Sequence, residues 1–566
     1  MRPRGALRDG EREVQDGPLP AAADVRAAMM QTLGMLASPG TWSSPGQPLV
    51  GRTVANTQFL KALLSHSSFE EIALFIGETA DLASLEKLTE NWNVPEERLA
   101  AYSLWQLPEL LARGRLDLIH HASHVDRLFD LIALRDRYAS KPVPVTGQIH
   151  SLSYPRFHED FSRQLLVPPS PGDALFCSST AGRTVIEKSV ARLASEAQRA
   201  GFTGAAPSWA LPVVPLGVEF DALQGGQRAV ARKQLEIPDD AVLFTCLARF
   251  TEFDKLDLFP LVRVLERVVR EPTAGAPPIY VLLAGARQGT KTPEMLELWA
   301  KHLGVGDRLR LRVDFLDDDK KHLLAASDVF VSPVDNVQET FGQSVIEAMA
   351  AGLPVIASDF DGYKDSIDAS VGVRVPTRRH ADWEELSELG PLLYERPLHL
   401  VLAQSIEVDL AALEAAVRDL ASDAKKRQSL GAAARERART RYAWKHVVAQ
   451  LESHWAELSK QARKPSGRAH PLKLDFADFF GHFTSAPVDA SLKVIRAERA
   501  DDFVIYPELK HLFVEEDVRA LLQTCTEPKT LEALTHEMKQ RLVDRRPWIA
   551  GFVVGWLLKQ GLLRAV

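Results

Sequence analysis

Residues 328–365, DVFVSPVDNVQETFGQSVIEAMAAGLPVIASDFDGYKD, decide the fold of this chain. The apolar run DVFVSPV predicts a buried strand, GQSVIEAMAAG predicts a helix that opens at Gly342, and LPVIASD predicts a second strand. Strands that are apolar throughout, rather than alternately apolar and polar, are typical of parallel sheets covered by helices on both faces. This stretch therefore predicts an α/β fold built on a parallel sheet.

The same alternation of strands and helices extends in both directions and divides into two sets. PSWALPVVPLGVEFD at residues 207–221, with three prolines and a glycine, breaks the rhythm between them. We expect two doubly wound, Rossmann-like α/β domains, at residues 25–212 and 213–462, with ligands bound in the cleft beyond the carboxyl ends of their strands. Strands are expected at residues 27–36, 71–77, 116–121, 142–151 and 173–179 in the first domain and at 241–250, 278–285, 309–316, 328–334 and 353–359 in the second.

The two ends of the chain differ from this α/β region. Residues 1–24 carry charges of both signs and no apolar core, so we expect a disordered tail and no signal peptide. Residues 411–460 predict a helical end to the second domain, and RKPSGRAHP at 463–471 has the composition of a linker. Residues 472–566 predict a small α+β domain of winged-helix type. Its expected elements are a β-hairpin at 491–509 and helices at 515–525, 530–542 and 547–561.

Composition limits the classes of protein that this chain can be. The 566 residues are 46% hydrophobic and carry a net charge of −7, which excludes bulk disorder and argues against nucleic acid as a partner. Cys177, Cys246 and Cys525 are too far apart in sequence for a cysteine metal site and favour a reducing compartment. The apolar run at residues 549–558 is much shorter than the roughly 20 residues that span a bilayer. We expect a cytoplasmic protein without a transmembrane segment, and a peripheral membrane contact stays open.

Two carboxylates, Glu339 and Glu347, stand on either side of Gly342 in the deciding stretch. As a hydrolase pair they would be roughly 12 Å apart along a helix, whereas glycosidase pairs are about 5–5.5 Å or about 6.5–9.5 Å apart. They are better suited to binding hydroxyl groups at two points of a longer ligand, beside the anion site at the helix amino terminus. The alternative is that Glu339 caps the helix and Glu347 lies on its solvated face, and the spacing alone leaves both open.

The pattern Glu339-x7-Glu347, followed by AMAAG and PVIASD, resembles the retaining glycosyltransferases of family four, which have the two-domain GT-B fold. The resemblance extends over residues 50–460 and includes VVPLGVEFD, LARFTEFDKLDL, VLLAG and RYAWKHVV in the family's order. It implies that Glu339 holds hydroxyl groups of the donor sugar and that Glu347 binds the ribose of the nucleotide.

The resemblance also implies a site for the donor diphosphate. The backbone amides of Phe341 and Gly342 would contact the sugar and phosphate, and Gly285, which ends VLLAG, would lie on the donor side. Arg249 and Lys255 match the family's diphosphate-binding cations, although Lys255 stands one residue farther along than is common. Two fixed cations and a helix amino terminus would neutralise a leaving phosphate. Solvated surface positions are the alternative for both cations.

Three histidines and one loop complete the expected site on the side of the first domain. His150 ends a strand in TGQIHS, where the family often has a histidine near the donor sugar and acceptor. The alternative is a histidine that is simply hydrogen-bonded within the fold. His120 and His121 end another strand and are secondary candidates. PGQPLVG at residues 45–51 occupies the place of the family's glycine-rich loop.

No metal is expected. DFD at residues 359–361 has the appearance of a metal-binding Asp-x-Asp motif. In the other glycosyltransferase fold, however, that motif lies in a single nucleotide-binding domain and not after a two-glutamate helix. GARQGTKT at residues 285–292 is one residue too short for the phosphate-binding pattern GxxxxGK[ST], and DDD at 317–319 lacks metal-ligand geometry.

The small domain at residues 472–566 faintly resembles the winged-helix peptide-recognition domains of peptide-modifying enzymes. Such domains can bind a peptide or protein as an added strand at the edge of a hairpin. A packing or oligomerisation module is the alternative. The near balance of positive and negative side chains makes nucleic acid an unlikely ligand of this domain.

These features together predict a retaining, metal-independent glycosyltransferase. Its donor would be a nucleotide-diphosphate sugar, which is a substrate and not a cofactor, and its acceptor is an unidentified glycan, lipid, small molecule or peptide. In a front-face mechanism the leaving phosphate oxygen would take the acceptor's proton. Two alternatives stay open, namely a non-catalytic peptide- or protein-binding protein on the same two-domain shell and a sugar-nucleotide epimerase.

Overall fold

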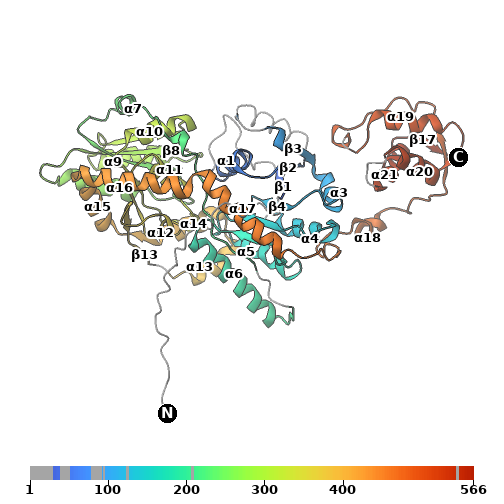
Figure 1. Ribbon diagram of the computed structural model, residues 1–566, viewed down its shortest axis with the longest axis horizontal. Coiled ribbons are helices and arrows are strands. Elements are labelled where there is room, and N and C mark those ends of the chain that lie inside the picture. Colours follow the sequence, from blue (N-terminus) through green and yellow to red (C-terminus); the bar gives the residue numbers. More distant parts are fainter. Residues whose placement is uncertain are drawn as a thin grey trace, which may run out of the picture.

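The computed structural model describes residues 30–37, 51–77, 92, 96–122, 127–204, 209–380, 382–510, 512–542 and 547–566. Two α/β domains lie side by side, and a smaller third domain follows at the carboxyl end (Figure 1). The predicted fold class is confirmed, because each of the first two domains contains a six-stranded parallel sheet. The expected tail at 1–24 and most of the expected loop at 45–51 lie outside the described residues.

The first sheet has the strand order β3-β2-β1-β4-β5-β6, and its neighbouring strands are parallel. The first strand begins at Thr32 rather than at residue 27. The edge strand β3 was not predicted, because LAAYS is only partly buried and lacks an apolar run. The strands are β1 (Thr32–Ala37), β2 (Glu71–Ile76), β3 (Leu99–Ser103), β4 (Leu118–His121), β5 (Val145–Gln148) and β6 (Ala174–Phe176). The helices are α1 (Gly51–His66), α3 (Leu107–Ala112), α4 (Leu128–Tyr138), α5 (Pro155–Phe161) and α6 (Thr180–Arg199).

The second sheet has the order β12-β11-β10-β7-β8-β9 and is also parallel. Its central strands β7 and β10 are buried along their whole length, which explains their unbroken apolar sequences. The strands are β7 (Val242–Leu247), β8 (Ile279–Gly285), β9 (Leu309–Val313), β10 (Val329–Ser332), β11 (Val355–Ser358) and β12 (Gly372–Val375). The helices among them are α7 (Arg228–Gln234), α8 (Phe259–Arg270), α9 (Thr292–His302), α10 (Lys320–Ala326), α11 (Gln343–Ala350) and α12 (Tyr363–Ser366).

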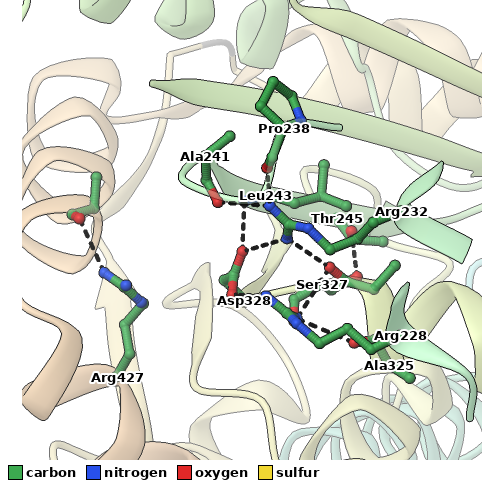
Figure 2. A network of polar contacts seen from close by, with 12 residues as sticks. Arg228, Arg232, Pro238, Ala241, Leu243, Thr245, Ala325, Ser327, Asp328 and Arg427 are labelled. Carbon is green, nitrogen blue, oxygen red and sulfur yellow. Dashed lines mark hydrogen bonds and ion pairs between the residues drawn. The ribbon is translucent and has the colours of Figure 1, made fainter. Parts of the chain in front are cut away.

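The amino-terminal edge of the second sheet is held by two arginines of α7 (Figure 2). Nη2 of Arg228 lies 2.7 Å from one carboxylate oxygen of Asp328, and Nη1 of the buried Arg232 lies 3.1 Å from the other. The same Asp328 accepts a 2.8 Å hydrogen bond from the backbone N–H of Leu243. Because Asp328 directly precedes β10, this network fixes α7 and the starts of β7 and β10 together. The network lies at the amino-terminal edge of the sheet, so the carboxyl-terminal edge takes no part in it.

The helical end of the second domain returns to the first. After the two-stranded ladder of β13 (Thr377–Arg379) and β14 (Ile406–Val408), helix α17 (Trp444–Gln461) packs into the core of the first domain. The indole of Trp455 is buried against Phe69 and Phe176 of that domain, with ring centroids 5.8 and 6.0 Å apart. Helix α17 therefore fastens the two domains to each other. The remaining helices are α13 (Glu384–Leu389), α14 (Glu395–Gln404), α15 (Leu410–Ser422) and α16 (Ala424–Arg437).

The segment expected as a linker lies against the first domain. The backbone N–H of Gly467 donates to the carbonyl of Asp136, and Nη1 of Arg137 donates to the carbonyl of Gly467, both at 2.8 Å. Nε2 of His470 lies 2.9 Å from a carboxylate oxygen of Asp130. These contacts dock the segment along α4. The short helix α18 (Phe476–Phe480) follows it.

The described part of the third domain contains a three-stranded antiparallel sheet and several helices. The hairpin predicted at residues 491–509 is wrong, because β15 pairs with two later segments and residues 497–506 form no strand. The charged run around Asp501 is exposed, while Phe503 and Ile505 pack on the core without entering the sheet. The winged-helix type and the recognition of a peptide stay predictions. The elements are β15 (Lys493–Arg496), β16 (Lys529–Thr530), β17 (Leu563–Ala565), α19 (Glu515–Thr524), α20 (Leu531–Arg541) and α21 (Pro547–Lys559).

Helix α21 is the most apolar of the third domain and its buried face lies in that domain's core. Its exposed Trp548 contacts Trp105 of the first domain, with ring centroids 5.8 Å apart. Across the described ranges, no helix is both long enough and apolar enough to cross a membrane.

Candidate active site

The loop between β10 and α11 lies at the carboxyl edge of the second sheet. Gly342 ends this loop with φ of +86°, a left-handed conformation that residues with a side chain rarely adopt. A Cβ atom on this residue would lie 1.9 Å from Cε1 of Tyr363, so no other residue fits without displacing the ring. Glycine thus lets the chain turn into α11 against Tyr363. The turn places Glu339 and the first amides of the helix at the same edge.

Glu339 binds both a lysine and the backbone of its own loop. Its Oε2 lies 2.5 Å from Nζ of Lys255. Its Oε1 accepts hydrogen bonds from the N–H groups of Thr340, Phe341 and Gly342 at 3.2, 3.2 and 2.8 Å. Burial would raise the pKa of Glu339, but Lys255 and the N–H groups of Phe341 and Gly342 outweigh burial and lower the pKa to about 2. Glu339 is therefore a carboxylate at neutral pH.

These bonds bear on two expectations about the loop. The alternative in which Glu339 acts as a cap is met in part, because its Oε1 accepts the amides that lead into α11. The amides of Phe341 and Gly342 were expected to contact a sugar and phosphate, and in this structure they donate to Glu339. A donor molecule would have to share or replace these bonds. The ring of Phe341 is buried, so only its backbone faces the loop.

Glu347 lies inside α11 and pairs with a different lysine. Its Oε1 lies 2.9 Å from Nζ of Lys320, which is also 3.0 Å from Oδ1 of Asp317. Burial would lower the pKa of Lys320, but Glu347 and Asp317 raise this pKa by more than burial lowers it, so the lysine stays charged. The alternative of a solvated Glu347 is wrong, because the residue is only 7% exposed. The two glutamates thus form two separate ion pairs along one loop and helix.

Arg249 and Lys255 lie in the loop that follows β7, next to this edge. Nη1 of Arg249 donates to Oδ2 of Asp254 at 3.0 Å and to Oε1 of Gln288 at 3.2 Å. Between Arg249 and Lys255 the chain has one residue more than is common in the family that it resembles. The chain makes a turn here, in which the N–H of Lys255 donates to the carbonyl of Thr251 at 2.9 Å. The two side chains are 24% and 21% exposed, so neither is a solvated surface cation.

Gly285 ends β8 beside the first residues of the Arg249 loop. A Cβ atom on it would fall 1.7 Å from the carbonyl oxygen of Ala248. The glycine therefore allows β8 to approach the end of β7 closely. Gly285 was also expected to lie on the donor side. That placement stays a prediction.

The histidines of the first domain differ in their surroundings. His120 is fully buried, and its Nδ1 lies 2.9 Å from Oγ1 of Thr146. Burial, followed by the charges of His121 and His150, lowers the pKa of His120 to about 3, so this side chain is neutral and suited to packing. His150 is partly buried and its Nε2 lies 2.9 Å from the carbonyl of Ala122. Its role at the sugar stays a prediction.

Side chains of the first domain reach the loops around Glu339. Tyr154, four residues after His150, is in electrostatic contact with Arg249, and burial raises its pKa. Hydrogen bonds between the two domains include those of Gln338 Nε2 to Tyr154 Oη, Ser178 Oγ to the carbonyl of Thr340 at 3.4 Å, the N–H of Thr180 to Asp365 Oδ2 at 2.6 Å, and Gln343 Nε2 to Gln58 Oε1 at 3.0 Å.

The structure thus brings Lys255 and Glu339 into direct contact and holds Arg249 in the adjoining loop. Sequence reasoning missed Lys320 and Tyr154. Lys320 starts a helix after the acidic run DDD, and an acidic run beside a lysine is the only signal that its sequence carries. Tyr154 lies in an irregular segment just before α5, where neither spacing nor hydropathy marks it.

Side chains that could hold a metal ion do not gather at this edge in the described residues. Within the ranges that the structure describes, no three His, Cys, Asp or Glu side chains are arranged to hold a metal ion. The three cysteines are buried and form no disulfide, and burial raises the pKa of the Cys177 and Cys246 thiols to about 12. They are therefore inert parts of the core.

Part of the second domain matches a known protein family. Residues 227–389 match the family model described as "Glycosyl transferases group 1". The D-inositol 3-phosphate glycosyltransferase of Geodermatophilus obscurus is 36% identical over 205 residues, which are 35% of this chain and 44% of that protein. D-inositol 3-phosphate glycosyltransferase 1 of Catenulispora acidiphila is 28% identical over 285 residues, 49% of this chain and 64% of that protein. The chain therefore matches less than two thirds of the length of either relative.

Two solved structures have the same arrangement of domains. The Anabaena protein HepE, crystallised in complex with UDP and glucose, has a TM-score of 0.50 at 15% identity, over 76% of this chain and 100% of that chain. The N-terminal domain of Candida albicans trehalose-6-phosphate phosphatase has a TM-score of 0.50 at 11% identity, over 75% of this chain and 97% of that chain. These likenesses concern the fold. Residues 227–389 therefore belong to the glycosyl transferases group 1 family, and the two α/β domains of the chain together have the GT-B fold.

Proposed function

We propose that the protein is a retaining glycosyltransferase whose donor is a nucleotide-diphosphate sugar. The pairing of Lys255 with Glu339 at the carboxyl edge of a group 1 domain is the observation that carries this proposal. Relatives with glycosyltransferase names and a solved structure of this fold with UDP and glucose support the donor class. The matched segments do not cover whole relatives, so the acceptor is left open.

The two carboxylates would bind the donor at two points. Glu339, ionised and buried, would accept hydrogen bonds from hydroxyl groups of the sugar. Glu347 would accept them from the ribose, while its contact with Lys320 holds it in place. A carboxylate has about four lone-pair sites, so each glutamate retains acceptor capacity beyond its lysine.

Negative charge grows on the leaving phosphate during transfer, and this charge has to be neutralised. Arg249 offers a planar fork and Lys255 a compact ammonium group in the same loop. The amino terminus of α11 adds the dipole and N–H groups of its first turn. Lys255 would exchange its contact with Glu339 in part for the phosphate. The chain's own cations thus supply the stabilisation that transfer requires.

The transfer step is proposed to occur on one face of the sugar. The bond between the anomeric carbon and the phosphate oxygen breaks, and a bond from the same carbon to the acceptor oxygen forms on the same side. The acceptor's proton passes to the departing phosphate oxygen, so no separate general base is needed. His150 would lie near the sugar and the acceptor and assist their positioning.

Closure of the two domains would keep water away from the donor. Gln338 and Tyr154 form a hydrogen bond across the domains within a few residues of Glu339 and His150. A closed cleft prevents wasteful hydrolysis of an activated sugar. The first domain would therefore complete the site as well as receive the acceptor.

A binding and release assay tests the proposal. The purified chain would be melted with UDP, GDP, UDP-glucose, UDP-N-acetylglucosamine and GDP-mannose, and release of free nucleotide diphosphate would be followed over hours. We expect a nucleotide sugar to stabilise the fold and to be slowly hydrolysed. No response to any donor would favour the non-catalytic alternative, and conversion of the donor sugar without an acceptor would favour an epimerase.

A further inference from the structure

A third carboxyl group, Asp361, lies next to the proposed donor site and has no part in the function described so far. It belongs to the loop between β11 and α12, and its φ is +41°. Residues with a side chain rarely adopt this left-handed conformation, because it strains the backbone. Strain of this kind is concentrated at functional sites.

The loop that carries Asp361 packs directly on the loop of Glu339. A Cβ atom on the adjacent Gly362 would fall 2.7 Å from the carbonyl oxygen of Thr340 and 2.9 Å from Cα of Phe341. The two backbones are therefore in contact. Asp361 is also close enough to Glu339 for their charges to interact. Asp361 thus lies at the same edge of the sheet as the carboxylate proposed to bind the sugar.

One oxygen of Asp361 is buried without a hydrogen-bond partner. Of the residues that the structure describes, none forms a hydrogen bond to Oδ2, and this atom is inaccessible to solvent. Leaving a buried polar atom unpaired is unfavourable, so such an atom calls for an explanation. Burial, followed by the charges of Glu339 and Asp365, raises the pKa of Asp361 well above its usual value. The raised pKa favours the protonated carboxyl group, which can both donate and accept a hydrogen bond.

We propose that Asp361 determines donor specificity by binding one hydroxyl group of the donor sugar through Oδ2, beside the hydroxyl groups bound by Glu339. This inference depends on the proposed function. A sugar hydroxyl both donates and accepts a hydrogen bond, so it matches a neutral carboxyl group. It would also satisfy the unpaired atom and offset the strain of the loop. An ammonium group of an amino sugar would instead require an ionised Asp361 beside the charged Glu339.

Binding measurements on the full chain separate the sugar from the nucleotide. The ratio of the wild type's affinities for UDP-glucose and for UDP, or for GDP-mannose and GDP if those bind, measures what the sugar adds to binding. We call this ratio the sugar increment. We expect D361G, which suits the left-handed backbone, to lose about tenfold or more of that increment while its affinity for the free nucleotide diphosphate is unchanged. D361N retains a donor and an acceptor and should lose less than about threefold. D359N is the matched control, because Asp359 on the same loop pairs with Arg374 at 3.1 Å.

Deoxy donors identify the bound hydroxyl. The wild type should bind one of the 2-, 3-, 4- and 6-deoxy analogues of its donor about tenfold more weakly than the parent sugar, and D361G should bind that analogue and the parent equally. An unchanged sugar increment in D361G, or an equal loss for every analogue, overturns the inference. Tighter binding of a 2-amino-2-deoxy donor than of the parent, lost in D361N, also overturns it.

The outcomes distinguish this inference from the proposed function. If the wild type binds neither nucleotide diphosphates nor nucleotide sugars, the proposed function fails and the inference fails with it. If the wild type binds and hydrolyses a nucleotide sugar but D361G leaves the sugar increment intact, the inference alone fails. Melting temperatures of D361G and D361N at or above that of the wild type show that lost affinity is not lost folding.

Discussion

Nζ of Lys255 lies 2.5 Å from Oε2 of Glu339, and the two residues are separated by 84 positions in the chain. The lysine comes from the loop after β7 and the glutamate from the loop after β10, which are neighbouring strands in the sheet. The pair joins the residue proposed to neutralise a phosphate to the residue proposed to hold a sugar. Binding of a donor and the strength of this ion pair are therefore coupled.

Replacing Glu339 by glutamine should abolish most of the turnover. The amide keeps the shape but loses the charge that binds sugar hydroxyls, and its NH₂ group faces Lys255. We expect donor hydrolysis or transfer to fall about a hundredfold or more with the fold intact. The measurement is single-turnover release of the nucleotide diphosphate. Glu297→Gln on the exposed face of α9 is the matched control, and near-normal turnover in Glu339→Gln would remove the assigned role.

Replacing Arg249 by alanine should also lower turnover about a hundredfold or more, because a guanidinium no longer stabilises the departing phosphate. The effect should be larger on kcat than on KM, since the charge develops in the transition state. Steady-state kinetics with the donor identified by melting would measure both. An effect confined to KM would show that Arg249 binds the ground state only.

Lys255→Met tests the ion pair as a structural element. It leaves Glu339 largely buried with its backbone donors but without its cation, so the free energy of unfolding should fall by about 2–3 kcal/mol. Urea denaturation followed by tryptophan fluorescence would measure this change. The exposed Lys301→Met is the control and should change stability by less than about 0.5 kcal/mol. The double variant Lys255→Met/Glu339→Gln should recover part of the loss, and no recovery would argue against the pair.

The depressed pKa of Glu339 predicts how stability depends on pH. Its pKa is about 2 in the folded chain and 4.5 as an ordinary glutamate, so the folded state favours the ionised form. The resulting stability is complete above pH 4.5 and is lost as the pH falls toward 2. Denaturation between pH 5.5 and pH 3 should therefore show a smaller loss of stability for Glu339→Gln than for the wild type. Parallel curves for the two proteins would contradict the lowered pKa.

Glu347→Gln should weaken binding of the nucleotide rather than the chemical step. Loss of the charge-assisted bonds to the ribose should raise KM for the donor about tenfold, with kcat changed less than about threefold. Calorimetric titration of UDP or GDP would show the same loss in affinity without any sugar. An unchanged affinity for the nucleotide would move Glu347 out of the donor site.

Much of the architecture could be read from local patterns. Long apolar stretches such as residues 328–334 and 353–359 become β10 and β11 because an all-buried strand needs no polar face. The edge strand β3 and the false hairpin at 491–509 show the limit of such patterns. In both places the partner strand, and not the local sequence, decides whether a segment enters a sheet.

The sequence by itself determined the two α/β domains and the placement of Glu339 and Glu347 on either side of a turning glycine, because hydropathy period and glycine conformation are local properties. Only the tertiary structure decided that Glu339 meets Lys255, that Glu347 meets Lys320, and that an oxygen of Asp361 is buried without a hydrogen bond from any of the described residues. Those contacts join loops that are distant in the chain. They arise from the order of strands in the sheet, which brings separate loops to one edge where burial then sets the charge of each group.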